Sequence, residues 1–163
     1  MPPPRPRPIS ATERRARQRR ASQIARRLGF VGRIEYRHVF TQAGGAQYGL
    51  GAAPEEDLLI VSAEAFERDA DPEDFSLEAI LAHERGHQLA ARHPRLTRNL
   101  PQPWSGVTEE IVASLLGSLL VEAEKDKQDL LLKALFEADR RGLEPDRATL
   151  LITELRALLE KIL

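Results

Sequence analysis

The sequence predicts an α+β protein, in which a small β-sheet and a set of helices form one domain over residues 10–163. The length of 163 residues is enough for a single domain that buries a hydrophobic core. Short runs that alternate in polarity or are strongly apolar lie in the first half, where they indicate strands. Amphipathic patterns fill the second half, so strands and helices are segregated along the chain, as in α+β folds.

The chain begins with a segment that is rich in arginine. Residues 1–33 hold ten arginines and one acid, a net charge of +9, whereas the rest of the chain has a net charge of −10. Residues 1–9 combine prolines with arginines and are expected to form a flexible basic arm. Ser10 and Glu13 form a capping box, so a helix should begin there and run to about Leu28.

Two or three strands are expected after this helix. Residues 34–40 alternate in polarity and residues 58–62 (LLIVS) are strongly apolar, and both runs predict strands. Between them, the glycines of residues 44–51 predict a turn and irregular extended chain. The acidic, proline-containing residues 69–74 are expected to form a loop.

The remainder of the chain is expected to be helical. The expected helices cover residues 76–92, residues 108–140 with a break near 125–128, and residues 146–163. Pro94 ends the first of them, Thr108 caps the second, and Gly142 with Pro145 marks the turn before the third. The last two helices are leucine-rich and are expected to pack back on the domain as a helical hairpin.

Composition excludes several classes of site and location. The absence of cysteine excludes disulfides, zinc-thiolate sites, iron–sulfur clusters and cysteine nucleophiles. No apolar run approaches the length of about 20 residues that spans a bilayer, and the first residues do not resemble a signal peptide. We therefore expect a cytoplasmic protein with no membrane partner. Nucleic acid is not an expected partner, because no aromatic residue is interleaved among the arginines of residues 5–27.

Residues 83–87, with the sequence HERGH, form an HExxH motif inside a helical pattern. On a helix, His83 and His87 lie about 40° apart and Glu84 about 60° beyond His87, while Arg85 points away. Two imidazoles one turn apart can bind one zinc ion, and the glutamate beside them can take a proton from the metal-bound water. An accidental match would leave these groups without a partner on a partly buried face, which is costly. The motif therefore predicts a site for one Zn²⁺ ion.

Glu110 is the expected third ligand, because a catalytic zinc normally has three protein ligands and an open position. It opens the helix after the motif and shares one face with mostly small residues, namely Ala113, Ser114, Gly117 and Val121. Small residues permit a close approach to a neighbouring helix. The competing interpretation of Glu110 is an acid that stabilises the helix N-terminus, a role that Glu109 can fill.

His93 is the alternative third ligand, because it completes the spacing of a zinc site with three histidines. That geometry requires the helix to break between His87 and His93. Glycine in a left-handed conformation usually provides the break, and Ala90 stands at that position, where its Cβ is unfavourable.

The combination of His83-Glu84-x-x-His87 with a later Glu110-x-x-Ala113-Ser114-x-x-Gly117 resembles the gluzincin metallopeptidases, especially the very small minigluzincins. The chain is also similar to the ImmA/IrrE-type peptidases in its length and in the order of its motifs. The resemblance rests on residues 83–87 and 110–117 and implies a zincin-like domain. It also implies that His83, His87 and Glu110 bind zinc and that Glu84 is the general base and acid.

The same resemblance implies a strand at the edge of the cleft, where the substrate adds as a further strand. Residues 58–62 or residues 48–51 match that strand. Two positions depart from the family pattern. Ser114 stands where many relatives have an aspartate or asparagine that orients a ligand histidine, and Arg85 stands where an uncharged residue is more frequent.

The sequence thus predicts a zinc-dependent metallopeptidase acting on a peptide or protein substrate. The alternatives are a metal-binding regulatory or interaction protein with little or no turnover, and a structural site with four protein ligands. The pattern does not select an oxyanion-stabilising residue among Tyr48, His38 and His93. Trp104 could line a substrate pocket.

Overall fold

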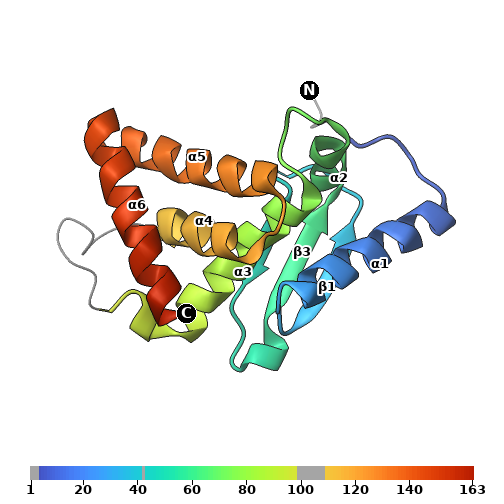
Figure 1. Ribbon diagram of the computed structural model, residues 1–163. Helices are drawn as coiled ribbons and strands as arrows, with labels where there is room; N and C mark the ends of the chain where they lie inside the picture. The colour runs from blue at the N-terminus through green and yellow to red at the C-terminus, as the bar shows by residue number, and fades with distance from the viewer. Residues whose placement is uncertain (1–3, 42, 99–108) are drawn as a thin grey trace.

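The computed structural model describes residues 4–41, 43–98 and 109–163 and has a mixed α+β fold, which confirms the predicted class (Figure 1). In this part of the chain the strands are β1 (Arg33–Arg37), β2 (Ala46–Gly49) and β3 (Leu58–Ser62). The helices are α1 (Ala11–Arg27), α2 (Ala63–Ala70), α3 (Leu77–Arg92), α4 (Glu109–Leu120), α5 (Glu124–Arg140) and α6 (Pro145–Ile162), with short 3₁₀ turns at Pro54–Glu56 and Pro94–Leu96. Trp104 and the expected helix cap Thr108 lie outside the described residues.

The sheet has β3 at its centre, with β1 parallel to it on one side and β2 antiparallel to it on the other. The register pairs Arg33 with Leu58 in the parallel ladder and Ala46 with Val61 in the antiparallel ladder. The edges of the sheet therefore belong to β1 and β2. The expectation that residues 58–62 could be the edge strand of a cleft is wrong, and of the two matching segments only residues 48–51 overlap an edge strand.

Three elements differ from the sequence-based expectations. β1 ends at Arg37 instead of Phe40, because its partner β3 ends at Ser62, where α2 begins. β2 forms within a segment expected to be irregular, because β3 supplies its hydrogen-bonding partner. Helix α2 was not expected and extends into the predicted loop, and it buries Ala63 and Ala65. Pairing and burial thus decide the local structure where the sequence pattern is weak.

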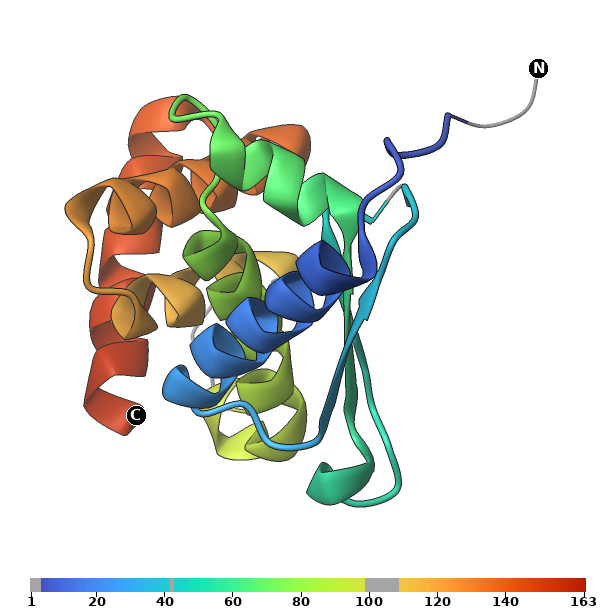
Figure 2. The ribbon, with the colours of Figure 1, turned by 90° about the vertical axis from the view of Figure 1, so that its right-hand side faces the viewer.

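Helices α1 and α3 lie on the same side of the sheet, which Figure 2 shows nearly edge-on. Ser10 caps α1 as expected, and its Oγ accepts a hydrogen bond from the Glu13 N–H at 3.0 Å. The expected contacts of α1 are buried, at Ile24, Ala25 and Leu28. These side chains join Leu59, Val61 and residues of α3 in one hydrophobic core, which fixes α3 against the sheet.

Helices α4, α5 and α6 enclose a second group of buried side chains, which includes Leu115, Leu116, Leu155 and Leu159. The two C-terminal helices therefore pack back on the domain, as expected. In Figures 1 and 2, α6 crosses α5 steeply instead of running back alongside it. The break between α4 and α5 lies at residues 121–123, slightly before the predicted position.

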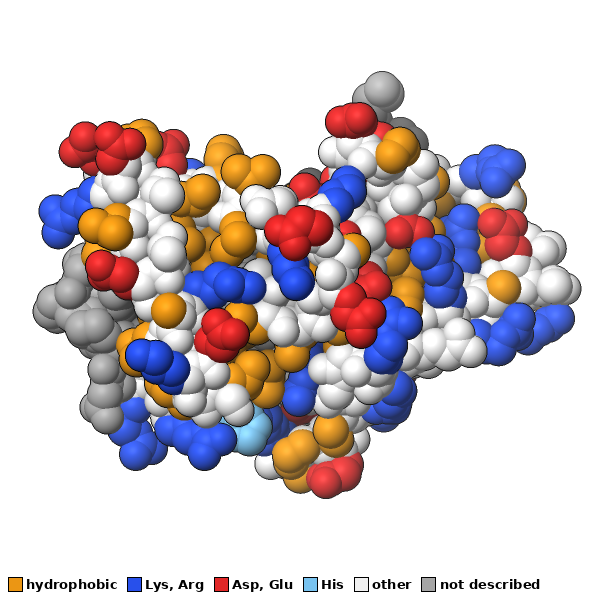
Figure 3. All heavy atoms as spheres, in the orientation of Figure 1, with side chains coloured by type: hydrophobic (Ala, Val, Ile, Leu, Met, Phe, Trp, Pro, Cys, Tyr) orange, Lys and Arg blue, Asp and Glu red, His pale blue; other side chains and the backbone are white. Residues whose placement is uncertain are grey.

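The surface of α1 carries many arginines, seen as blue side chains on the right of Figure 3. Several of them pair with acids of the body, among them Arg20 with Asp69 and Arg27 with Glu78. Hydrophobic side chains gather between α5 and α6 in the same view. Among the described residues, none of the helices is both long enough and apolar enough to cross a membrane.

Candidate metal centre

The HExxH motif lies in the middle of α3, which begins at a well-formed cap. The Ser76 Oγ accepts a hydrogen bond from the Ala79 N–H at 3.1 Å and donates one to Asp126 at 2.6 Å. Helical periodicity then places His83, Glu84 and His87 on one face, with the first two buried and His87 half-buried. One ligand atom from each of the three side chains lies within 4.8 Å of the others, so the group could hold a metal ion.

Helix α4 approaches α3 very closely, and two glycines permit this. A Cβ on Gly86 would lie 2.2 Å from the carbonyl oxygen of Ala113, and a Cβ on Gly117 would lie 2.9 Å from that of Ala82. Neither helix could come so near with a larger residue at these positions. The prediction that small residues of α4 allow close packing is thereby confirmed, and Gly86 supplies the matching gap on α3.

This packing brings the Glu110 carboxylate to the two histidines. Glu110 Oε2 lies 3.0 Å from His83 Nε2, and Glu110 Oε1 lies 3.1 Å from His87 Nε2. The two Nε2 atoms are themselves 3.1 Å apart. The three residues predicted from the sequence as ligands therefore converge on one point, although 23 to 27 positions separate Glu110 from the histidines.

The donor set fits a zinc ion in chemistry and in spacing. Zinc prefers imidazole nitrogen and carboxylate oxygen among the ligands available in a chain without cysteine. With bonds of about 2.0–2.2 Å, tetrahedral ligand atoms are about 3.3–3.6 Å apart. The observed separations of 3.0–3.1 Å are slightly shorter, so a small outward movement of the three side chains would admit the ion.

The outer nitrogens of both rings have partners that orient the rings. His83 Nδ1 lies 2.9 Å from the hydroxyl oxygen of Ser114, and His87 Nδ1 lies 3.2 Å from the Glu109 carboxylate. When each Nδ1–H donates to its partner, each Nε2 presents a lone pair inward, as a ligand histidine must. Ser114 is thus the partner of His83 Nδ1, at the position where the sequence departs from the family that it resembles.

Glu84 projects from α3 toward the edge strand β2. Its Oε2 accepts a hydrogen bond from the Tyr48 backbone N–H at 3.1 Å. Burial raises the pKa of Glu84 to about 7, and the negative charge of Glu110 adds to this, against the opposing effects of His87 and the Tyr48 N–H. A carboxyl group with this pKa can both accept and release a proton near neutral pH.

Burial and mutual contacts also shift the pKa values of the other groups of the centre. Contacts with His83 and His87 hold the pKa of Glu110 well below its usual range. Burial lowers the pKa of His83 and outweighs the opposite effect of its hydrogen bond to the Glu110 carboxylate. Burial also disfavours the charged form of His87, but the neighbouring carboxylates raise its pKa overall. The centre therefore combines a negative carboxylate with two inward nitrogens, which favours a cation between them.

His93 lies apart from this centre. Helix α3 continues without a break to Arg92, and the His93 N–H donates to the Leu89 carbonyl as the exposed C-cap. The break that a three-histidine site would require is therefore missing. Of the other candidates for an oxyanion group, the Tyr48 hydroxyl donates to Asp57, and His38 bonds Tyr36 and the carbonyl oxygen of Arg7.

A buried carboxylate, Asp57, was not predicted and joins the edge strand to α3. It is completely buried and accepts hydrogen bonds from the Tyr48 hydroxyl at 2.8 Å, the Gly51 N–H at 2.7 Å and the Gln88 amide at 2.8 Å. It also pairs with the guanidinium of Arg92. Asp57 thereby fixes the spacing between β2 and the helix that carries the motif. No local pattern around it distinguishes it from the exposed acids beside it.

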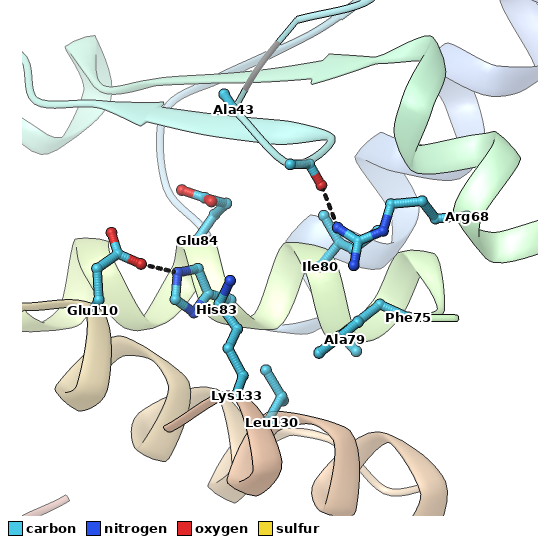
Figure 4. Close-up of a pocket in the computed structure, with 11 residues that line it drawn as sticks. Ala43, Arg68, Phe75, Ala79, Ile80, His83, Glu84, Glu110, Leu130 and Lys133 are labelled. Carbon is cyan, nitrogen blue, oxygen red and sulfur yellow. Dashed lines mark hydrogen bonds and ion pairs between the residues drawn. The ribbon is translucent and has the colours of Figure 1, made fainter. Parts of the chain in front are cut away.

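A pocket of about 110 Å³ opens beside His83 and Glu84, on the side of the N-terminal half of α3 (Figure 4). Its walls combine apolar side chains of α3 and α5 with two cations, Arg68 from α2 and Lys133 from α5. Figure 4 shows Lys133 extending from α5 toward His83. Neither cation stands out in the sequence, because α2 and α5 are distant from the motif along the chain.

Comparison of the chain with models of known protein families, with curated proteins and with solved structures finds no match.

Proposed function

We propose that the protein is a zinc-dependent metallopeptidase that hydrolyses peptide bonds in a peptide or protein substrate. The observation that carries the proposal is the convergence of His83 Nε2, His87 Nε2 and the Glu110 carboxylate at 3.0–3.1 Å. Two imidazoles and one carboxylate form a ligand set of zinc hydrolases, which leaves one position open. Glu84 stands beside this set, where such enzymes need a base.

Bound zinc would supply a Lewis acid that polarises the scissile carbonyl and lowers the pKa of a water molecule toward about 7. The residues of the chain supply the rest of the chemistry. The Tyr48 N–H holds Glu84 Oε2, which fixes the direction of the carboxylate. The same carboxylate takes the proton from the attacking water and passes it to the leaving amine.

The edge strand β2 supplies a binding surface for an extended peptide. The Ser62 N–H donates to the Gly45 carbonyl in the ladder with β3, so by alternation the backbone groups of Tyr48 face the free edge. The Tyr48 N–H reaches Glu84 across this edge, which places the edge next to the metal centre. A substrate added there as a strand would carry its scissile bond toward Glu84.

The direct test is cleavage of an unstructured protein by zinc-loaded material, with and without a chelator. We expect cleavage that the chelator abolishes and added zinc restores. The variant Glu84→Gln should keep the metal and lose hydrolysis by a factor of about 100 or more, the usual contribution of a general base. Glu55→Gln is the matched control, because Glu55 is an exposed glutamate that does not line the pocket at the centre. Activity that survives in Glu84→Gln would contradict the mechanism.

The alternative is a metal-binding regulatory or interaction protein with little turnover, and the small size of the pocket at the centre favours it. The two functions differ in one result. Zinc bound at one ion per chain, together with no chelator-sensitive cleavage of any tested substrate, would support the alternative and exclude the peptidase.

A further inference from the structure

The pocket beside Glu84 is lined by apolar side chains and by charged groups of both signs. Phe75, Ile80 and Leu130 contribute apolar surface, and Arg68 and Lys133 contribute positive charges. The carboxylates of Glu84 and Glu110 line its side toward the candidate metal centre. The volume of about 110 Å³ exceeds the roughly 10–15 Å³ that one water molecule needs, so a short side chain fits. A pocket with this lining selects a group that combines a short apolar stem with a charged end.

The two cations have different surroundings. Arg68 pairs with Asp74 at 3.0 Å and donates to the Gly44 carbonyl at 2.6 Å, so its charge is compensated and it supports the wall (Figure 4). Lys133 makes no hydrogen bond or ion pair with any residue that the structure describes. The nearest acids on its own helix are already paired, Asp129 with Lys125 and Glu137 with Arg140. Lys133 is therefore a half-buried cation at the pocket without a counter-ion in the described chain.

Lys133 lies close to the candidate metal centre. It lines the same pocket as His83, Glu84 and Glu110, and Figure 4 shows its side chain extending from α5 toward His83. A bound divalent ion would balance the carboxylates of Glu84 and Glu110, so that Lys133 would add an uncompensated positive charge at the pocket. A half-buried charge of this kind is stabilised by an opposite charge from a ligand.

We propose that this pocket binds a carboxylate of the substrate, with Lys133 as its counter-ion. The carboxylate belongs either to an Asp or Glu side chain next to the scissile bond or to a free peptide C-terminus. This inference rests on the proposed peptidase function and adds the substrate class to it: Lys133 determines specificity, and the pocket selects acidic peptides over neutral ones of the same shape.

The test uses zinc-loaded protein and end-blocked hexapeptides that differ only in a central Glu or Gln. A second pair has neutral side chains and either a free or an amidated C-terminus. We expect kcat/KM to favour one carboxylate-bearing peptide by about tenfold or more, as for one hydrogen bond to a charged group. Lys133→Met should reduce that preference to less than about threefold, with little change for the neutral peptide. The preferred pair identifies which carboxylate the pocket takes.

Two further variants control the interpretation. Lys133→Arg keeps the charge and should retain most of the preference, which excludes a general folding defect. Lys127→Met removes a lysine of the same helix that does not line the pocket, and the preference should not change. A wild-type preference that persists in Lys133→Met, or a wild type without any preference, would overturn the proposal.

A binding measurement separates this inference from the proposed function. Fluorescence anisotropy of labelled Glu and Gln peptides is measured on zinc-loaded Glu84→Gln, with and without Lys133→Met. If no peptide is hydrolysed but binding still favours the carboxylate through Lys133, the peptidase function fails and the carboxylate site stands. If binding shows no such preference, the site fails even where hydrolysis occurs.

Discussion

Gly86 of α3 faces the backbone of Ala113 in α4 so closely that a Cβ at position 86 would stand 2.2 Å from the Ala113 carbonyl oxygen. This contact sets the distance between the two helices. It also sets the position of Glu110, which lies one turn before Ala113 in α4 and contacts His83 and His87. The geometry of the candidate metal centre therefore depends on one glycine inside the HExxH motif, at a position that the motif does not specify.

The variant Gly86→Ala tests this dependence. Alanine favours a helix over glycine by about 1 kcal/mol, so local propensity alone predicts a more stable protein. The clash with a backbone atom instead predicts a loss of about 1–3 kcal/mol and weaker zinc binding, as for an overpacked core. Thermal unfolding and zinc titration measure both. Gly117→Ala, whose Cβ would have contacts of 2.9 Å and longer, should have a smaller effect. A stabilised Gly86→Ala with normal zinc affinity would refute the argument.

The variant Ser114→Ala removes the hydroxyl group that lies 2.9 Å from His83 Nδ1. Loss of a partner that orients a ligand histidine typically costs 10–100-fold in metal affinity. We expect zinc affinity to fall by about tenfold and the helix content to stay the same. Ser118→Ala, one turn further along α4, removes a buried hydroxyl that bonds Leu115 and Arg156 and should leave zinc affinity unchanged. Equal affinities in the two variants would show that Ser114 does not orient His83.

The variant Asp57→Asn tests the link between β2 and α3. Burial raises the pKa of Asp57, but hydrogen bonds from Arg92, Gln88, Gly51 and Tyr48 outweigh burial and hold the pKa well below its usual range. Neutralising one partner of such a buried pair should lower the free energy of unfolding by about 3 kcal/mol or more at pH 7. Glu55→Gln, at an exposed acid nearby, should have no measurable effect.

The same residue predicts a pH dependence. A carboxyl whose pKa is depressed in the folded state contributes stability above its unfolded pKa of about 3.9, and this contribution is lost as pH falls through the folded pKa. The difference in unfolding free energy between wild type and Asp57→Asn should therefore be constant from pH 7 to about pH 5 and shrink below pH 4. Denaturant unfolding at several pH values measures it. A difference that grows toward low pH would contradict the assignment.

The sequence predicts much of this molecule where local signals are strong. The Ser10 cap, the apolar run of β3 and the helical spacing of the motif each depend on neighbouring residues, and each is found as expected. The contact of Glu110 with the histidines is non-local, and the small residues on one face of α4 still predict it. Which of these contacts bind zinc stays a prediction.

Other features have no local signal. β2 forms only because β3 pairs with it. Asp57 has the same local sequence signal as its exposed acidic neighbours, and only tertiary packing buries it. Lys133 reaches the pocket because α5 packs against α4, 50 positions along the chain from His83. These positions are determined by tertiary packing, which one sequence read segment by segment does not reveal.

The most direct test of the account is the zinc content of the protein after equilibration with zinc and removal of excess metal. The wild type should hold one zinc ion per chain, His83→Ala and Glu110→Ala should hold close to none, and His93→Ala should match the wild type. A wild type that binds no zinc, or a loss of zinc in His93→Ala with retention in Glu110→Ala, would contradict the central claim that His83, His87 and Glu110 hold the metal.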